Sequence, residues 1–141
     1  MVEAVDPMPI KYYGAPDVKR RVDRLIHQLD LAHISPPMVY CCRSRGSKSR
    51  YVVARIHGMR RIWQEVLNLP SAYIIEVISE RYDRLVEEDQ EKTLIHELLH
   101  IPKGFAGGFR PHKGYVTRQR VERLYKMLQR NNQGTRNEFG L

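Results

Sequence analysis

The segment His96-Glu97-Leu98-Leu99-His100 constrains this chain more than any other part of its sequence. Two histidines four residues apart project from one face of an α-helix, close enough to bind one metal ion. Glu97 lies about 100° further round such a helix, where its carboxylate reaches a water molecule on the metal but not the metal itself. The pattern therefore predicts a helix with His96 and His100 as metal ligands and Glu97 as a general base.

The apolar residues around the motif fit the same helix. When His96 is placed at 0° on a helical wheel, His100 falls near about 40°. The opposite arc, from roughly 160° to 300°, carries only large aliphatic side chains: Leu94, Ile95, Leu98 and Leu99. An acidic start, and Pro102 just beyond the motif, bound the helix at about 86–100. We therefore expect its aliphatic side to face the core and its histidines to face the other way.

A third ligand is expected, because catalytic zinc usually has three protein ligands and keeps its fourth position for water. His112 follows the motif across a glycine-rich loop (103–109) that can bring the imidazole back over the helix. Glu122 is the alternative ligand, but it lies at the margin of a later helix's apolar stripe, among basic residues that offer it ion pairs. The sequence thus favours Zn²⁺ on His96, His100 and His112.

The remaining patterns predict one small α+β domain over residues 1–141. The expected elements are a helix from Pro16, strands at 38–43 and 50–57, a helix at 59–69, a strand at 73–79, the helix at 86–100 and a last helix at 116–129. Residues 1–14 are expected to form an irregular arm and residues 131–141 a loose tail. The strand at 73–79 is either a sheet edge that pairs with an extended peptide or an internal strand. This element order is typical of a minimal zincin-like fold, with a small mixed sheet packed on the HExxH helix between flanking helices.

The stretch from Thr93 to Tyr125 resembles the SprT-like zinc metallopeptidases and archaeal proteins named only as metallopeptidases. In those families a loop follows the HExxH helix, then a third histidine in an H-x-x-x-aromatic setting, then a C-terminal helix. Pro111-His112-Lys113-Gly114-Tyr115 is similar, with the aromatic residue one position early. By element order the resemblance covers roughly residues 36–128. It implies peptide hydrolysis at a zinc ion held by the three histidines.

Charge and composition indicate which partners to expect. The net charge of +8 makes nucleic acid a candidate partner. The basic residues form two groups, Arg43, Arg45, Lys48 and Arg50 around a turn, and Arg118, Arg120, Arg123, Lys126 and Arg130 near the C-terminus. No apolar run approaches the length of a membrane span and the N-terminus does not resemble an export signal, so we expect a cytoplasmic protein without membrane contact. The adjacent Cys41 and Cys42 are expected to stay reduced.

Together these features favour a zinc-dependent metallohydrolase, specifically a peptidase that acts on a peptide or protein substrate. Glu97 is expected to take the proton of the attacking water and pass it to the leaving nitrogen. Tyr115, near His112 in sequence, is the candidate donor to the oxyanion, unless it is simply a core tyrosine. The alternative function is a basic nucleic-acid-binding domain with a structural or vestigial metal site. An intact Glu97 favours the enzyme, because a structural site has no use for a general base.

Overall fold

The computed structural model describes residues 9–138. This part of the chain forms a mixed four-stranded sheet with five α-helices, which confirms the predicted α+β class. The strands are β1 (Lys11–Gly14), β2 (Val39–Arg45), β3 (Ala54–Gly58) and β4 (Tyr73–Ile78). Their order across the sheet is β1-β2-β4-β3; β2 and β4 are parallel, and β1 and β3 run antiparallel to their neighbours.

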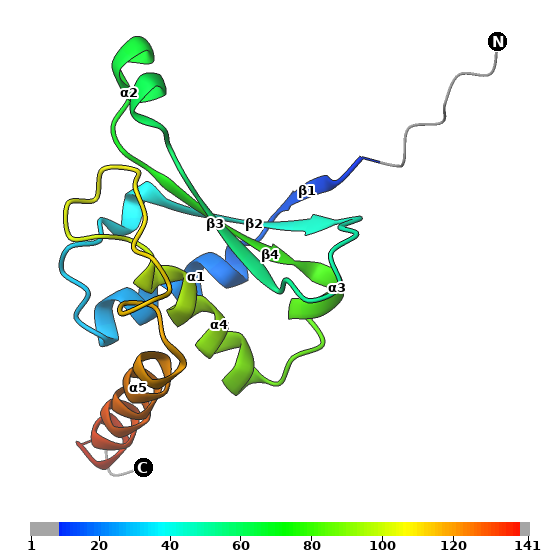
Figure 1. Ribbon diagram of the computed structural model, residues 1–141. Helices are drawn as coiled ribbons and strands as arrows, with labels where there is room; N and C mark the ends of the chain where they lie inside the picture. Colours follow the sequence, from blue (N-terminus) through cyan, green and yellow to red (C-terminus); the bar gives the residue numbers. More distant parts are fainter. Residues whose placement is uncertain (1–8, 139–141) are drawn as a thin grey trace.

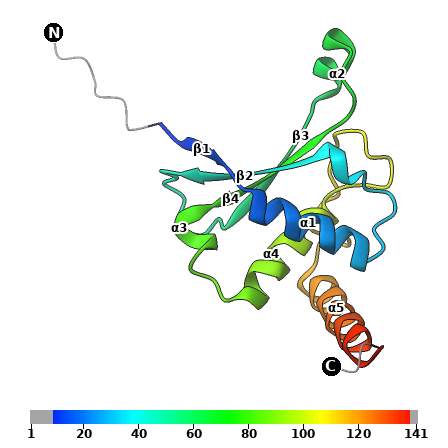
Figure 2. The same ribbon diagram turned by 180° about the vertical axis from the view of Figure 1, so that it is seen from behind.

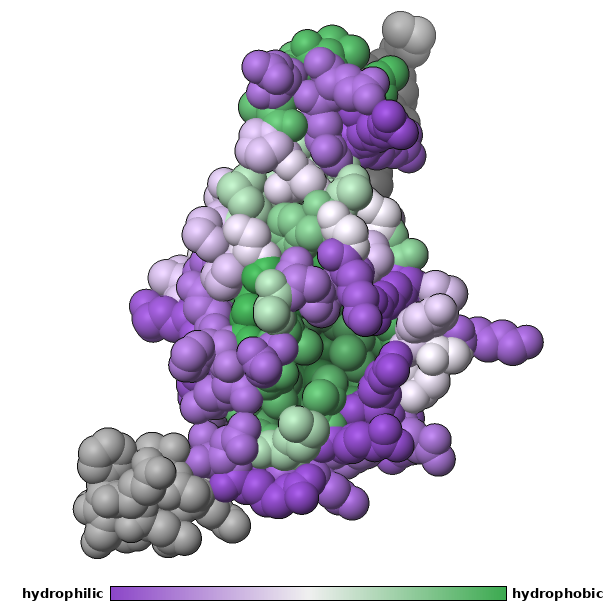
Figure 3. All heavy atoms as spheres, turned by 90° about the vertical axis from the view of Figure 1, so that its left-hand side faces the viewer, coloured by the Kyte–Doolittle hydropathy of each residue, from purple (hydrophilic) through white to green (hydrophobic). Residues whose placement is uncertain are grey.

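The helices are α1 (Pro16–Gln28), α2 (Arg61–Leu67), α3 (Ser79–Tyr82), α4 (Glu87–Leu99) and α5 (Arg118–Glu138). Figures 1 and 2 show α1 and α4 on one side of the sheet, with α5 beside α4. At the opposite end α2 projects from the molecule, at the tip of the connection between β3 and β4. Figure 3 shows hydrophobic side chains among hydrophilic ones at this tip, and a hydrophobic hollow between hydrophilic rims further down the same face.

The core lies between the sheet and these helices. Ile75 and Val77 alternate along β4 on the side of the helices and are fully buried, as the two-residue period of a strand requires. The helices contribute aliphatic side chains that are at most 1% exposed: Val18, Val22, Leu25, Leu94, Ile95 and Leu98. Each contributes about 1.5–3 kcal/mol by leaving water. Burial of the aliphatic side of α4 fixes the rotation of this helix, and so directs its motif histidines to the other side.

The sheet corrects the prediction of an irregular arm at 1–14. Its last four residues, Lys11–Gly14, form the edge strand β1, which pairs antiparallel with β2. All four residues are exposed, so backbone pairing and not an apolar pattern makes this strand. Residues 1–8 of the predicted arm lie outside the described residues.

Two further sheet predictions are decided by the topology. The strand predicted at 73–79 is internal, between β2 and β3, so its backbone is already paired on both sides. The strand predicted at 50–57 begins only at Ala54, and it forms the edge of the sheet beside α4. The edge strands are therefore β1 and β3, and of these β3 is the one beside α4 that could pair with an extended peptide.

The last helix is longer than its apolar pattern predicts. α5 continues to Glu138, through most of the stretch from 131 that was predicted to be a loose tail. The sequence of this stretch is polar, and its first two residues meet α1 through hydrogen bonds. Asn131 Nδ2 donates to the Gln28 carbonyl oxygen at 3.0 Å, and Gln28 Nε2 donates to Asn132 Oδ1 at 3.3 Å. Residues 139–141 lie outside the described part of the chain.

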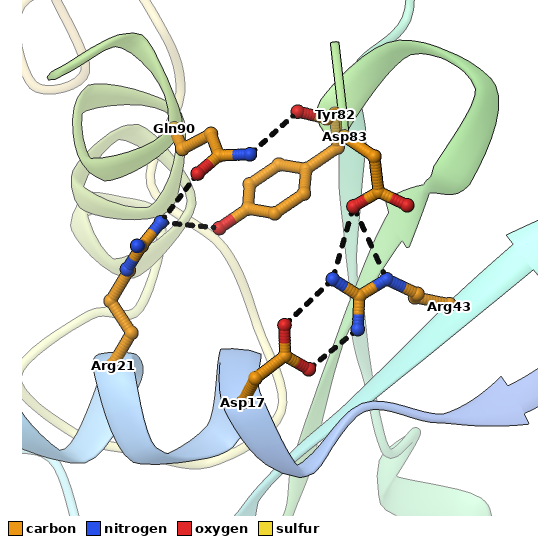
Figure 4. A network of polar contacts seen from close by, with 6 residues as sticks. All are labelled: Asp17, Arg21, Arg43, Tyr82, Asp83 and Gln90. Atoms are coloured by element: carbon orange, nitrogen blue, oxygen red, sulfur yellow. Dashed lines mark hydrogen bonds and ion pairs between the residues drawn. The ribbon is translucent and has the colours of Figure 1, made fainter. Parts of the chain in front are cut away.

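A polar network joins α1, β2, α3 and α4 (Figure 4). The guanidinium of Arg43 donates to both carboxylate oxygens of Asp17, at 2.5 and 2.8 Å, and to Asp83 at 3.0 Å. Beside it, Arg21 donates to the Tyr82 hydroxyl at 3.2 Å and to Gln90 at 2.8 Å. Because Arg43 is paired with two carboxylates within the fold, it is no longer a candidate for contact with nucleic acid, unlike the other members of the first basic group.

Candidate metal centre

Three histidines lie together where α4 ends. His96 is in the last turn of α4, His100 caps it, and His112 comes from the loop between α4 and α5. Their ligand nitrogens all lie within 4.8 Å of one another, and their ring centroids are 4.6–5.3 Å apart. Imidazole is a preferred ligand of zinc, and three imidazoles with a fourth position left open are the donor set of a catalytic site. The residues therefore fit one such ion.

A backbone contact orients His100. Its Nδ1 lies 2.8 Å from the Arg110 carbonyl oxygen, and the Arg110 N–H donates to the His100 carbonyl oxygen at 2.7 Å. A carbonyl oxygen can only accept, so Nδ1 of His100 carries the proton and Nε2 keeps its lone pair for a metal. Sequence reasoning did not find this partner, because a backbone carbonyl can come from any residue type.

The charges of the site are shaped by burial. Burial raises the pKa of the Glu97 carboxyl to about 8. Burial, together with the nearby His100 and His112, lowers the pKa of His96 to about 4. At neutral pH the metal-free protein therefore holds His96 neutral, which is the form with a lone pair for a metal.

The histidines and Glu97 line a cleft of about 1050 Å³. One wall is β3 with the residues just before it, and the opposite wall is the first part of α5. Its lining combines the polar residues Asp89, Lys92 and Thr93 of α4 with aliphatic side chains: Val52, Val53, Ile56, Leu85 and Val121. The site is thus a groove open to a long ligand, with a metal-binding cluster and a carboxyl at one place in it.

The two remaining candidates from the sequence lie apart from the cluster. The Glu122 carboxylate forms an ion pair with Lys92 at 2.9 Å. Among the described residues, the group close enough together to hold a metal ion consists of the three histidines and does not include Glu122. Tyr115 is 47% exposed and is not among the residues that line the cleft; its ring lies 5.5 Å from the guanidinium of Arg110, which does line it. The position of Glu122 is that of an ion-pair partner, and a role of Tyr115 toward an oxyanion stays a prediction.

An HExxH helix with a third histidine beside it, in an α+β fold, is the arrangement of a zincin-like metal site. The family model described as "Putative phage metallopeptidase" matches residues 10–133, and the chain belongs to this family. No curated protein and no solved structure matches it. The family confirms the metallopeptidase class expected from the sequence, whereas the narrower resemblance to SprT-like enzymes and the identity of the metal go beyond what it shows. Among the described residues, no helix combines the length and apolarity needed to cross a bilayer.

Proposed function

We propose that this chain is a zinc-dependent peptidase, with the metal on His96, His100 and His112 and with Glu97 as the general base. The observation that carries the proposal is the meeting of three imidazoles and a buried carboxyl in one open cleft. A zinc ion held there would supply Lewis-acid activation of water and of a peptide carbonyl. Membership of a metallopeptidase family supports the same chemistry.

Glu97 is suited to move a proton within this site. It lies on α4 between the two motif histidines and faces the same cleft. Its raised pKa of about 8 in the metal-free protein means that the carboxyl holds a proton readily. The positive charge of a bound zinc ion would favour the ionised form of this group, and the carboxylate would then take a proton from the attacking water and return it to the leaving nitrogen.

The polypeptide substrate would lie along β3. This edge strand forms one wall of the cleft, and its outer backbone groups can pair with an extended chain. Tyr115 is our candidate for a donor to the developing oxyanion, through its place beside Arg110 at the cleft rim.

Cleavage of a mixed peptide library by the purified protein tests the function. We expect cleavage that a chelator abolishes and stoichiometric Zn²⁺ restores, with one zinc per chain by elemental analysis. A protein that binds zinc but leaves every peptide intact would contradict peptidase activity, and one that takes up no zinc would contradict the metal site.

The second candidate function is contact with nucleic acid, supported by the exposed basic residues at the start of α5. Arg118, Arg123 and Lys126 line one shallow surface there, next to the cleft. Fluorescence anisotropy with single- and double-stranded DNA at low and at high salt tests it, because phosphate contacts weaken steeply as salt rises. Binding that Arg123→Glu does not reduce would place the contact elsewhere.

A further inference from the structure

The loop that carries His112 is held by the sheet as well as by α4. It leaves α4 after His100 and passes beside the α2 end of the sheet before it returns to the cleft (Figure 1). A His ligand on a long loop brings an entropic cost, since the loop must be ordered before the imidazole can serve as a ligand. What fixes the loop in the metal-free protein therefore bears directly on metal affinity.

Tyr73 is the residue of the sheet that meets this loop. It is fully buried on β4, and its hydroxyl donates to the Gly108 carbonyl oxygen at 2.8 Å and accepts from the Gly107 N–H at 2.9 Å. Its ring also packs against the rings of Phe105 and Phe109, with centroids 5.0 and 5.9 Å away. The Tyr73 hydroxyl thus forms one hydrogen bond with the backbone of each of two consecutive loop residues.

Two further contacts hold the same turn of the loop. Gln64 Nε2, on α2, donates to the Ala106 carbonyl oxygen at 3.1 Å and to the Met59 carbonyl oxygen at 2.7 Å. Gly107 has φ +95°, and a Cβ there would lie 2.1 Å from the Met59 carbonyl oxygen. The glycine is therefore required both by its left-handed backbone and by the closeness of the strand end.

We propose that Tyr73 is a positioning residue for the third metal ligand. Its hydroxyl fixes Gly107 and Gly108, which lie just before Arg110 in the chain. The backbone N–H and carbonyl oxygen of Arg110 both contact His100, and His112 follows two residues later. Gln64 supports the same turn from α2. This inference rests on the proposed metal site, and it assigns to a core tyrosine the task of pre-ordering a ligand loop.

Tyr73→Phe tests the inference, because it removes the hydroxyl and keeps the ring in the core. We expect the zinc dissociation constant to rise about 10–100-fold, the range typical of residues that orient a ligand from outside the coordination shell. The matched control is Tyr82→Phe: Tyr82 is equally buried and its hydroxyl is also bonded, but to Arg21, away from the loop. Zinc affinity of this control should stay within about twofold of the parent, as expected for a site with no shared partner.

A second measurement uses the metal-free proteins. Hydrogen exchange at the Gly107 amide should be about fivefold faster or more in Tyr73→Phe, since one hydrogen bond of roughly 1 kcal/mol is lost. Equal zinc affinity and equal exchange in the parent and Tyr73→Phe would overturn the inference, as would an equal loss in both tyrosine variants. If the parent takes up no zinc, the proposed function fails, and the exchange measurement still decides whether Tyr73 holds the loop.

Gln64→Ala covers the case in which Tyr73→Phe does not fold. Gln64 lies on the projecting α2 and outside the core, so its loss leaves the packing intact. We expect a zinc dissociation constant about threefold higher or more, for the loss of one hydrogen bond to the loop. An unchanged dissociation constant in this variant would show that contacts to this turn of the loop do not set the zinc affinity. In that case the inference would be overturned.

Discussion

At the scale of single residues, Glu97 is the side chain whose role can be separated most cleanly from that of its neighbours. In the metal-free protein its carboxyl holds a proton at neutral pH, so a glutamine there matches its size and its charge. We therefore expect Glu97→Gln to fold and to bind zinc like the parent, but to cleave peptides about 10²–10⁴-fold more slowly. Elemental analysis and kcat/KM on one peptide measure the two effects. His96→Ala and His100→Ala should instead lose stoichiometric zinc, and cleavage by Glu97→Gln at the parental rate would refute the mechanism.

The third ligand allows a second comparison of single residues. His112→Ala should weaken zinc binding by more than the 10–100-fold or so that outer-shell changes cost, because it removes a ligand from the cluster. Glu122→Gln should leave zinc binding within about twofold, since Glu122 pairs with Lys92, and Lys92 keeps Glu88 as a partner at 3.2 Å. A chelator competition titration measures both. Loss of zinc in Glu122→Gln alone would show that the glutamate is the ligand.

The residues of the cluster could be predicted because motif spacing is local information. His96 and His100 follow from the helical period, and His112 follows from the count of ligands that zinc prefers. The contacts that hold them could not be predicted in the same way. Arg110 acts through its carbonyl oxygen, and Tyr73 reaches the loop from a strand that lies 34 residues earlier in the chain. Only the packed structure brings such groups together.

At the scale of elements, the pair of Asp17 and Arg43 joins α1 to β2 and gives a pH-dependent prediction. The hydrogen-bonded Arg43 guanidinium lowers the pKa of Asp17 from 3.8 to about 2. A carboxyl with a lowered pKa in the folded protein stabilises it fully above about pH 4, and this contribution is lost as the pH falls through 2. The Asp17 side chain is 55% exposed, so solvent screening limits the effect to about 1 kcal/mol or less.

Urea unfolding of the parent and Asp17→Asn checks this expectation. The difference in unfolding free energy should be present at pH 6 and should shrink toward zero as the pH falls from 4 to 2. Asp30→Asn serves as the control, because Asp30 is exposed and outside the network of Figure 4. A difference that stays constant down to pH 2 would show that the ion pair does not supply the stability.

A second prediction at this scale concerns the contact between β3 and the ligand loop. A Cβ at Gly58 would lie 2.2 Å from the Gly107 carbonyl oxygen, so Gly58→Ala forces the strand end and the loop apart. We expect a loss of about 1–3 kcal/mol, as for other overpacked sites, together with weaker zinc binding. Gly104→Ala is the matched control, because it lies on the same loop and a Cβ there would meet nothing within 4 Å. Equal stability of the two variants would contradict this close approach.

The elements themselves were predicted where a strong apolar period marks them. α1 and α4 have such a period, β4 is marked instead by a run of β-branched and aromatic residues, and all three lie where these patterns indicate. β1 is an exposed strand made by pairing with β2, and the polar stretch of α5 from residue 131 meets Gln28 of α1 through Asn131 and Asn132. Neither carries a hydrophobic signal, because tertiary contacts rather than local burial stabilise them.

At the scale of the whole molecule, the order of the strands decides which backbone faces the cleft. The sequence leaves the strand at 73–79 as either edge or internal, since a continuous apolar run fits both. In the sheet, β4 lies between β2 and β3, and β3 becomes the edge beside the histidine cluster. The proposed function therefore predicts that a substrate pairs with β3 as an added strand.

N-methylated peptides test this mode of binding, because a methyl group on an amide removes its hydrogen bond and leaves the side chain unchanged. Along an edge strand only alternate residues direct their backbone groups outward, so methylation of alternate substrate amides should have alternating effects. Away from the scissile bond, we expect kcat/KM to fall about three- to tenfold at each amide that pairs with β3 and to change little at the amides between. The intervening positions are the matched control. A uniform loss along the peptide would indicate steric exclusion, and no loss at any position would show that the substrate does not pair with β3.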